Sequence, residues 1–349
     1  MTRRRWLMVV LGAAAVLLIV GRALAGAYAD YLWYESLGAV ALWRTREMAE
    51  LALRGGSALG AALFAFANLY AVRQSVVSLV FPRRLANLEI GEEVPGRYLV
   101  GAAAALSIVL AVLLMMPDDN WMSFVLARSG IPFNESDPYF SFDLGFFVYW
   151  LPLENAIWMW AFVLVLVVSV VVILLYALTP SLKWQRGKVY ASTYVRRHFM
   201  VLVGVMLLLL AWSFRLDMYS LLIKGTGVED AVNYVDIKVG VPGDLLLALV
   251  TLGGALIVIW AGFVGQFRLA TISVLTVIAL SIAVRVVGPA IASHSGTDAN
   301  RVAREAPYKA TRATYTRRAF DVDTVPRADA SIPFSSITAA APWIPVWDA

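Results

Sequence analysis

The 349-residue chain contains no cysteine and only two histidines, His198 and His294. It therefore has no disulfide, no thiolate nucleophile and no cysteine-ligated metal, and it has few side chains for other metal or acid–base chemistry. Charged residues are also scarce, at 15% of the chain, whereas they make up about a quarter of soluble domains. Nucleotide-binding and nucleophile motifs are missing as well. We therefore expect no catalytic residue, no metal site and no cofactor.

The chain is instead rich in long apolar segments, and 60% of its residues are hydrophobic. About 20 consecutive helical residues cross a hydrocarbon core of about 30 Å, and a helix satisfies its own backbone hydrogen bonds there. We predict an all-α membrane protein with seven transmembrane helices. The predicted spans are Trp6–Leu24, Gly55–Val72, Tyr98–Met116, Ala156–Leu178, Phe199–Asp217, Leu245–Val264 and Leu269–Ile291.

The distribution of basic residues predicts the orientation, since Lys and Arg favour the cytoplasmic side. Most basic residues that flank the spans lie before the first helix, in the loop 73–97 and in the loop after the fourth helix. We therefore predict a cytoplasmic N-terminus and, with an odd number of helices, an exported C-terminus. The first span has the basic start of a secretory signal peptide. Its apolar run is longer and its cleavage site weak, so we interpret it as a retained anchor.

The predicted organisation is a membrane domain over residues 1–291 and an exported tail over residues 292–349. The inner loop 73–97 is predicted to be a short hairpin or an amphipathic segment on the membrane surface. The outer loop 117–155 is rich in aromatic rings, which are typical of the headgroup level. The tail is polar and contains several prolines.

Three stretches outside the predicted spans combine aromatic and acidic residues with Gly or Pro. They are Tyr31-Leu-Trp-Tyr-Glu-Ser-Leu-Gly38, Asp137-Pro-Tyr-Phe-Ser-Phe-Asp143-Leu-Gly-Phe-Phe-Val-Tyr-Trp-Leu-Pro152, and Asn300–Tyr308 followed by Thr316–Asp323. Together they resemble the uncharacterised UPF0182 family of bacterial multi-pass membrane proteins. Lys309 and Arg312 stand where the family pattern has an apolar residue and an asparagine.

The resemblance implies a seven-helix architecture, an exported C-terminus and a location in the bacterial plasma membrane. Family members are longer and carry a large exported domain after the seventh helix, and Trp343–Ala349 resembles the beginning of that domain. The expectation is that the chain is a shortened member or lacks most of that domain. Because the family has no established activity, the resemblance implies no substrate.

Three arginines lie near the predicted outer ends of the spans, where ionisable residues are candidates for function. They are Arg22, Arg215 and Arg285. One interpretation is that they reach the interface or pair with a nearby carboxylate, for which Asp30, Asp217 and Asp244 are the candidates. The other is that they bind an anionic lipid headgroup or an acidic partner.

Among the carboxylates of the aromatic loop, the candidates for function are Asp137, Asp143 and Glu154. Paired carboxylates can perform acid–base chemistry or bind Ca²⁺. The Asp137-Pro138 step is also typical of turns and caps, and we interpret the three as structural.

Gly56 and Gly60 form a Gly-x-x-x-Gly pattern that predicts close helix packing, within the bundle or against another subunit. His198 follows two arginines at the start of a span, and we interpret it as a surface residue near anionic lipid.

The leading functional hypothesis is a non-enzymatic scaffold or accessory subunit at the outer face of a bacterial plasma membrane. Its partners would be membrane lipids and other membrane subunits, with no nucleic acid, because the basic residues lie beside the spans. One alternative is a transporter or lipid-handling protein with an outer site for anionic headgroups. Another is the anchor of an enzyme whose catalytic domain lies outside this sequence.

Overall fold

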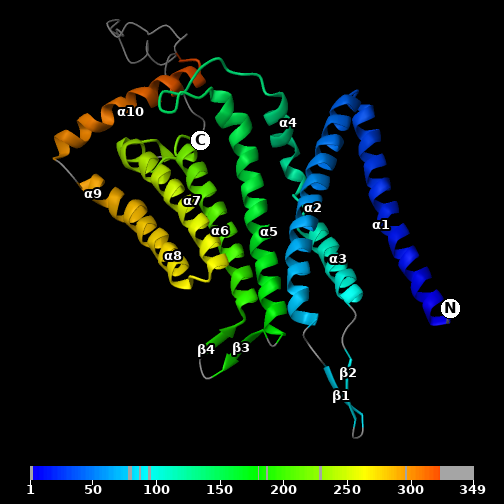
Figure 1. Ribbon diagram of the computed structural model, residues 1–349. Helices are drawn as coiled ribbons and strands as arrows, with labels where there is room; N and C mark the ends of the chain where they lie inside the picture. The colour runs from blue at the N-terminus through cyan, green and yellow to red at the C-terminus, as the bar shows by residue number, and fades with distance from the viewer. Residues whose placement is uncertain are drawn as a thin grey trace, which may run out of the picture.

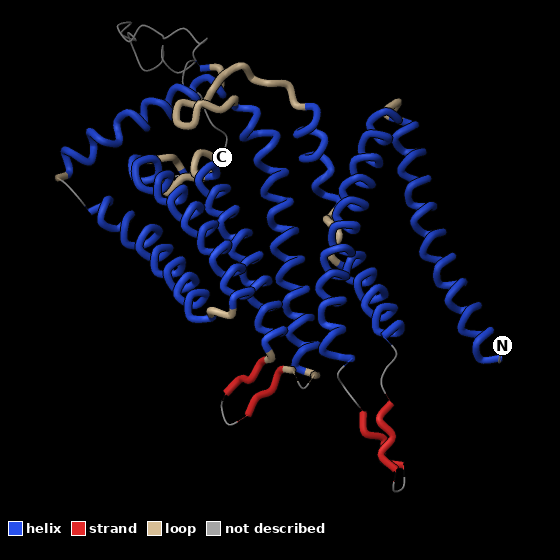
Figure 2. The backbone as a smooth tube through the Cα atoms, viewed as in Figure 1, coloured by secondary structure: helices blue, strands red, loops and turns tan. Residues whose placement is uncertain are grey.

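The computed structural model describes residues 3–77, 81–85, 88–92, 96–179, 181–185, 188–227, 230–294 and 297–322. Within these ranges long α-helices run side by side, with short hairpins at one end of the bundle (Figures 1 and 2). The elements in chain order are α1 (Arg3–Ser36), α2 (Val40–Val77), β1 (Phe81–Leu85), β2 (Leu88–Glu92), α3 (Gly96–Leu113), η1 (Asp118–Asn120), α4 (Trp121–Ser129), η2 (Phe146–Trp150), α5 (Leu151–Ala177), β3 (Leu182–Gln185), β4 (Lys188–Ala191), α6 (Thr193–Ser220), η4 (Asp236–Gly240), α7 (Val241–Val264), α8 (Phe267–Ile282), η5 (Ala283–Val287), α9 (Gly288–His294) and α10 (Asp298–Ala319).

Six helical stretches of the described chain are long and apolar enough to cross a membrane, which confirms an all-α, multi-pass membrane protein. They are Val40–Arg73, Gly96–Leu113, Phe146–Ala177, Thr193–Ser220, Asp236–Val264 and Phe267–His294. Each contains most of one of the last six predicted spans. The first predicted span lies in α1, a continuous helix of 34 residues that is not one of these six. A seventh span and the orientation therefore stay predictions.

The aromatic stretch 117–155 is only partly irregular. It contains the short helices η1 and α4, and the following span begins at Phe146, with the π-helical turn η2, rather than at Ala156. Between α4 and η2 the chain forms a compact loop in which Asn134 and Ser141 adopt positive φ angles of 54° and 59°. This loop lies at the opposite end of the bundle from the hairpins (Figure 2).

Two antiparallel hairpins form the loops at the other end (Figure 2). β1 pairs with β2 after α2, with Pro82 opposite Gly91, so the loop 73–97 contains a hairpin. β3 pairs with β4 after α5, with Lys183 opposite Tyr190. This second hairpin was not predicted from the sequence.

The helices pack as two groups that share α6. In the first group, Val168, Val172 and Tyr176 of α5 are fully buried against α2, α3 and α6. In the second group, Val258 and Ala261 of α7 are fully buried between α6 and α8. The helix contacts around α6 are therefore mainly apolar.

Two glycines allow α6 and α7 to approach closely. A Cβ atom on Gly262 would lie 2.6 Å from Cβ of Met200, and a Cβ atom on Gly204 would overlap the side chain of Ile259. Neither position has room for a side chain. Small residues have this role at helix contacts in membranes, where packing rather than the hydrophobic effect holds helices together.

The helix is interrupted between α3 and α4, and side chains of neighbouring helices form hydrogen bonds with the backbone groups there. The carbonyl of Leu114 accepts a hydrogen bond from Nε1–H of Trp160 at 2.7 Å, and the N–H of Met116 donates to Oγ of Ser57 at 2.9 Å. Met116 is 3% exposed, so an unpaired amide at this place would be costly.

Helix α10 lies across the ends of the helices on the side of the aromatic loop (Figure 1). Its N-terminus is capped by Thr297, whose Oγ1 accepts from the N–H of Asn300 at 3.5 Å. The first part of the predicted polar tail is therefore helical, although Pro307 lies inside the helix. Residues 323–349 of that tail lie outside the described residues.

Candidate functional site

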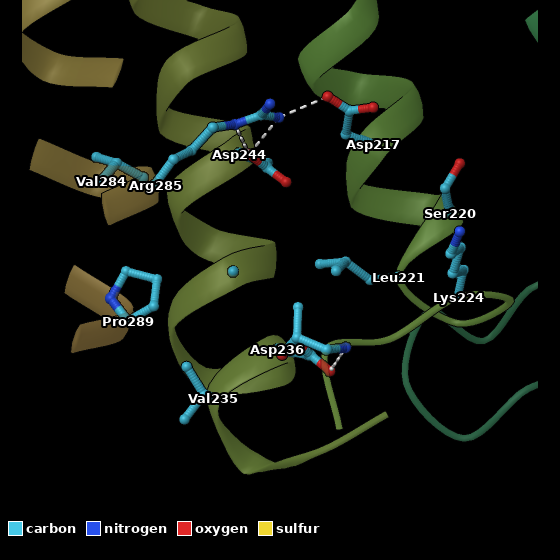
Figure 3. Close-up of a pocket in the computed structure, with 12 residues that line it drawn as sticks. Asp217, Ser220, Leu221, Lys224, Val235, Asp236, Asp244, Val284, Arg285 and Pro289 are labelled. Atoms are coloured by element: carbon cyan, nitrogen blue, oxygen red, sulfur yellow. Dashed lines mark hydrogen bonds and ion pairs between the residues drawn. The ribbon is translucent and has the colours of Figure 1, made fainter. Parts of the chain in front are cut away.

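Three charged side chains tie α6, α7 and η5 together at the end of the bundle that carries the aromatic loop. Arg285 Nη2–H donates to Oδ2 of Asp217 at 2.6 Å and to Oδ1 of Asp244 at 2.9 Å (Figure 3). Its Nε–H donates to the same Asp244 oxygen at 3.1 Å, and its guanidinium lies 4.6 Å from the ring centre of Phe214. Both carboxylates were named from the sequence as candidate partners of an arginine.

A cavity of about 410 Å³ opens beside this cluster. Two π-helical turns, η4 and η5, form part of its wall, and turns of this kind often occur at functional sites. Figure 3 shows Arg285 meeting Asp217 and Asp244 between α6, α7 and η5, with Leu221, Val235 and Pro289 around the space and Ser220 and Lys224 at its edge. The lining residues are Asp217, Ser220, Leu221, Lys224, Thr226, Val235, Asp236, Gly240, Asp244, Val284, Arg285 and Pro289.

Asp236 was not singled out from the sequence, yet it organises one side of the cavity. It is 2% exposed, and its two oxygens accept from the N–H of Thr226 at 2.9 Å, Oγ1–H of Thr226 at 2.5 Å and the N–H of Asn233 at 3.1 Å. Its own N–H donates to Oδ1 of Asn233 at 2.9 Å. The pattern Asn-x-x-Asp at a helix start was the signal in the sequence, because these side chains cap helices.

The second candidate arginine, Arg215, pairs with a different helix. It forms an ion pair with Oε1 of Glu154 on α5, which also accepts from Nε1–H of Trp212 at 2.9 Å. Oε2 of Glu154 is buried and has no hydrogen-bond partner within the described ranges. Arg215 therefore binds α5, whereas Arg285 binds α6 and α7.

Arg22 does not join either pair. It is exposed on α1, which packs against α2 on the far side of the bundle from α8 and α9 (Figure 1). The structure therefore does not bring the three candidate arginines together, and no described residue is hydrogen-bonded to the side chain of Arg22.

The two candidate aspartates of the aromatic loop accept hydrogen bonds from the loop backbone. Asp137 is 5% exposed and accepts from the N–H groups of Tyr139, Phe140 and Phe142 at 2.8, 2.8 and 3.1 Å. The three amide donors fix the turn that follows Pro138. This arrangement is typical of a structural aspartate.

Asp143 has the same kind of surroundings. It accepts from the N–H of Gly145 at 2.7 Å and from the N–H of Phe133 at 3.1 Å. These backbone hydrogen bonds, that of Gly145 first, lower the pKa of the carboxyl below its ordinary value. Among the residues that the structure describes, no group of three His, Asp or Glu side chains is spaced to hold a metal ion.

The candidate packing glycines have different neighbours. A Cβ atom on Gly60 would lie 3.2 Å from the ring of Trp160, so Gly60 is in contact with α5. A Cβ atom on Gly56 would meet no described atom within 4 Å. Within the described chain, helix packing thus uses Gly60 and leaves the position of Gly56 open.

Helix α10 is fastened to the aromatic loop by an ion pair and by ring contacts. Arg318 donates from both terminal nitrogens to the two oxygens of Glu135 at 2.7 and 2.9 Å, and this lowers the pKa of Glu135. The ring of Tyr308 stacks on Tyr139, with centroids 6.0 Å apart, and meets the edge of Tyr234 at 6.4 Å.

A second cavity of about 450 Å³ lies under α10. Its walls are mainly apolar and aromatic, and they come from the aromatic loop, the segment after α6 and α10. The lining residues are Phe133, Asp137, Pro138, Tyr139, Leu144, Phe147, Val148, Leu222, Ile223, Asp230, Ala231, Val232, Tyr308, Thr311, Arg312 and Tyr315.

The interpretation of His198 as a surface residue is wrong. Its Nδ1 lies 2.8 Å from the hydroxyl of Tyr176 on α5, and its Nε2 lies 2.9 Å from Oδ1 of Asn68 on α2. The side chains of Arg197 and Arg196 point to other sides of the helix, since one and two residues correspond to about 100° and about 200° of rotation. The polar Asn68 inside an apolar span was the signal in the sequence for a buried partner.

Comparison with known proteins gives a family but no activity. Residues 7–341 match the uncharacterised protein family UPF0182. A UPF0182 protein of Desulforamulus reducens is 27% identical over 92% of this chain and 36% of its own length. One from Synechococcus sp. (strain JA-2-3B'a(2-13)) is 32% identical over 70% of this chain and 26% of its own length.

The same relationship extends to a UPF0182 protein of Geobacter sulfurreducens, which is 28% identical over 93% of this chain and 37% of its own length. The chain thus spans only about a third of the length of these curated relatives. No solved structure matches it. Because the match covers almost the whole chain, this protein belongs to the uncharacterised UPF0182 family of bacterial proteins.

Proposed function

We propose that this chain is a non-enzymatic membrane scaffold whose outer face holds an exported helix in a fixed place. The observation that carries the proposal is the docking of α10. Its residues Glu305, Tyr308, Thr311 and Tyr315 recur at helical spacing and are the less exposed side of an otherwise exposed helix. The bundle binds that side through the aromatic loop and the segment before η4.

The docking contacts have the composition of a recognition surface. Tyrosine rings make up the centre, and the Arg318–Glu135 ion pair lies at one end. The N–H of Tyr234 donates to the carboxylate of Glu305 at 3.3 Å. Aromatic residues and arginine are the residues that most often dominate the energy of interfaces. In the role proposed, the six apolar spans are the anchor, and α10 holds the exported part of the chain where other subunits can bind it.

The proposed topology has seven spans, a cytoplasmic N-terminus and α10 outside. Both hairpins and the turn at Gly265 lie at one end of the bundle, and α10 lies at the other (Figure 1). The basic residues of the loops gather at the hairpin end, which supports that end as the cytoplasmic one. With α1 as a seventh span, the N-terminus is on the same side.

The docking is tested by cysteine cross-linking. Because the sequence contains no cysteine, only the introduced cysteines can react. In Tyr139→Cys/Tyr308→Cys, a short bis-maleimide is expected to join the loop to α10 in membranes of intact cells. The matched control is Tyr139→Cys/Ala310→Cys, because Ala310 is exposed about 200° around α10 from Tyr308. Equal cross-linking of the two pairs would contradict the docked position.

The topology is tested by single cysteines at exposed turns. Asp119→Cys lies on the side of the aromatic loop and Gln266→Cys lies in the turn between α7 and α8. A maleimide that does not cross membranes is expected to label intact cells at position 119 only, and position 266 only after lysis. The reverse pattern would invert the proposed orientation.

The scaffold role itself is tested by purification from native membranes in mild detergent, followed by mass spectrometry. A stoichiometric subunit is expected with the natural chain and is expected to be lost with Glu135→Ala/Tyr139→Ala, which removes contacts to α10. A chain that purifies alone in both forms would contradict the role.

A second candidate function is lipid handling, which the cavity beside Arg285 favours. An anionic headgroup is the less favoured ligand, because Arg215 and Arg285 are each bound by carboxylates of the chain itself. The net charge of the residues that line the cavity is a more direct indication of its ligand than the number of arginines.

A further inference from the structure

The cavity beside Arg285 is lined by more negative than positive side chains. Its carboxylates are Asp217, Asp236 and Asp244, and its basic groups are Lys224 and Arg285. One negative charge is therefore in excess. Apart from Ser220 and Thr226 the remaining lining is apolar, and in such surroundings a charge without a counterion is costly.

The excess charge has a definite position. Both oxygens of Asp236 accept hydrogen bonds from Thr226 and Asn233, and Arg285 takes one oxygen each of Asp217 and Asp244. Oδ2 of Asp244 has no hydrogen-bond partner among the described residues. The Asp244 side chain is 9% exposed, and Figure 3 shows the second oxygen directed into the cavity.

A carboxylate whose side chain is nine-tenths buried, and whose second oxygen faces a cavity, fits a ligand with a charged N–H donor. Charge-assisted hydrogen bonds of this kind are about twice as strong as neutral ones. Ser220 supplies a second acceptor, since its hydroxyl hydrogen is donated to the carbonyl of Leu216 at 2.9 Å and its lone pairs remain. A metal ion fits less well, because no three carboxylates of the described chain, those of this cavity included, are placed to hold one.

Lys224 indicates what else the ligand carries. It is exposed at the rim of the cavity, and no described group is bonded to its ammonium. A ligand with an ammonium group at Asp244 and an anionic group a few atoms away would satisfy both ends of the cavity. The volume of about 410 Å³ is within the range of small-molecule sites.

We propose that this cavity binds a phosphoethanolamine group, with the primary ammonium at Asp244 and the phosphate at Lys224. The source we favour is a membrane lipid, because Val286 and Ile291, on η5 and α9 beside the cavity, are 61% and 65% exposed. Acyl chains can lie along this apolar surface while the headgroup enters the cavity. The proposal goes beyond the scaffold role and does not depend on it.

The test is lipid binding to the purified full-length chain, measured by native mass spectrometry in detergent. The probes are phosphatidylethanolamine, phosphatidylcholine, whose quaternary ammonium has no N–H donor, and phosphatidylglycerol. The natural chain is expected to prefer phosphatidylethanolamine about tenfold, which is the effect of one charge-assisted hydrogen bond. Equal binding of the three lipids, or a preference for phosphatidylglycerol, would overturn the proposal.

Two variants locate the site, and two matched controls change the same residue types outside it. Asp244→Asn and Lys224→Gln are expected to lose the preference, whereas Asp119→Asn and Lys238→Gln, exposed and outside the lining, are expected to keep it. Preference retained in both cavity variants would refute the assignment. If Asp244→Asn elutes as an aggregate, Lys224→Gln decides alone, since Lys224 is exposed.

Soluble glycerophosphoethanolamine distinguishes the two sources of the same chemistry. If it displaces the lipid at comparable concentration, the headgroup alone is recognised and a soluble ligand is the source. If it does not, the acyl chains contribute and the source is the membrane. Both results support a phosphoethanolamine site, and the lipid comparison above is the part that can overturn it.

Discussion

The hydrogen-bonded chain from Tyr176 through His198 to Asn68 connects three of the six spans. The donor and the acceptor of each bond can be assigned from the Asn68 end. Nδ2–H of Asn68 donates to the carbonyl of Phe64 at 2.8 Å, so Oδ1 is left as the acceptor. Nε2–H of His198 therefore donates to Asn68, and Nδ1 accepts from the Tyr176 hydroxyl. We expect Tyr176→Phe to weaken the bundle, because it removes the donor that Nδ1 requires.

The expected loss is about 1 kcal/mol. Tyr176 is fully buried, and phenylalanine keeps its ring in contact with Phe199, so no cavity is created. A neutral hydrogen bond contributes about 0.5–1.5 kcal/mol to stability. Measured values between membrane helices average about 0.6 and reach about 1.7 kcal/mol. His198→Phe is expected to cost about 2 kcal/mol, since it removes two hydrogen bonds and leaves the buried Tyr176 hydroxyl and the half-buried Asn68 oxygen unpaired.

The assay is equilibrium unfolding of the purified chain in mixed micelles, followed by tryptophan fluorescence. A double-mutant cycle of Tyr176→Phe with His198→Phe is expected to give a coupling free energy of about 0.5–1.5 kcal/mol. The control is Tyr70→Phe, because Tyr70 is 42% exposed and its ring contact with Arg73 survives the change. Additive effects of the two substitutions, within about 0.3 kcal/mol, would refute the bond.

Two further predictions concern the docked helix and the α6–α7 contact. Arg318 lowers the pKa of Glu135, so the ion pair stabilises docking above the ordinary glutamate pKa of about 4.3 and loses this effect as the pH falls through the lowered pKa. The distance between spin labels on α10 and the aromatic loop should therefore stay constant from pH 8 to pH 5 and lengthen below about pH 4. A constant distance at low pH would contradict the prediction. Gly262→Ala is expected to destabilise the bundle by about 1–3 kcal/mol through its clash with Met200, whereas Gly253→Ala, with no described atom within 4 Å, should be neutral or stabilising in the same unfolding assay.

The spans were predictable because each rests on the summed hydrophobicity of about 20 residues, which no single contact can reverse. The residues at which the spans begin and end were harder to predict. The fourth predicted span began at Ala156, but the helix begins at Phe146, because the aromatic residues Phe146–Trp150 form a π-helical turn rather than a loop. Aromatic rings are typical of the interface both in helices and in loops, so composition alone does not separate the two.

Helix α10 was missed for a different reason. Its charge and Pro307 favoured an irregular tail, and its helical propensity is too weak to decide alone. The helix is stabilised by groups far away in the sequence, such as Glu135 and Tyr139. A pattern of less exposed positions at Glu305, Tyr308, Thr311 and Tyr315 becomes visible only when the surface that covers them is known.

The sequence predicts that the arginines pair with carboxylates, but it does not predict which residues pair. A charge within a membrane span requires compensation, and the alternation of spans places Asp217, Asp244 and Arg285 at the same end of the bundle. It does not show that Arg285 would bind two carboxylates at once through one oxygen each. An unpartnered carboxylate oxygen that faces a cavity is a sharper pointer to a ligand than the number of arginines. Among the described residues Oδ2 of Asp244 is such an oxygen, whereas the unpartnered Oε2 of Glu154 does not line that cavity.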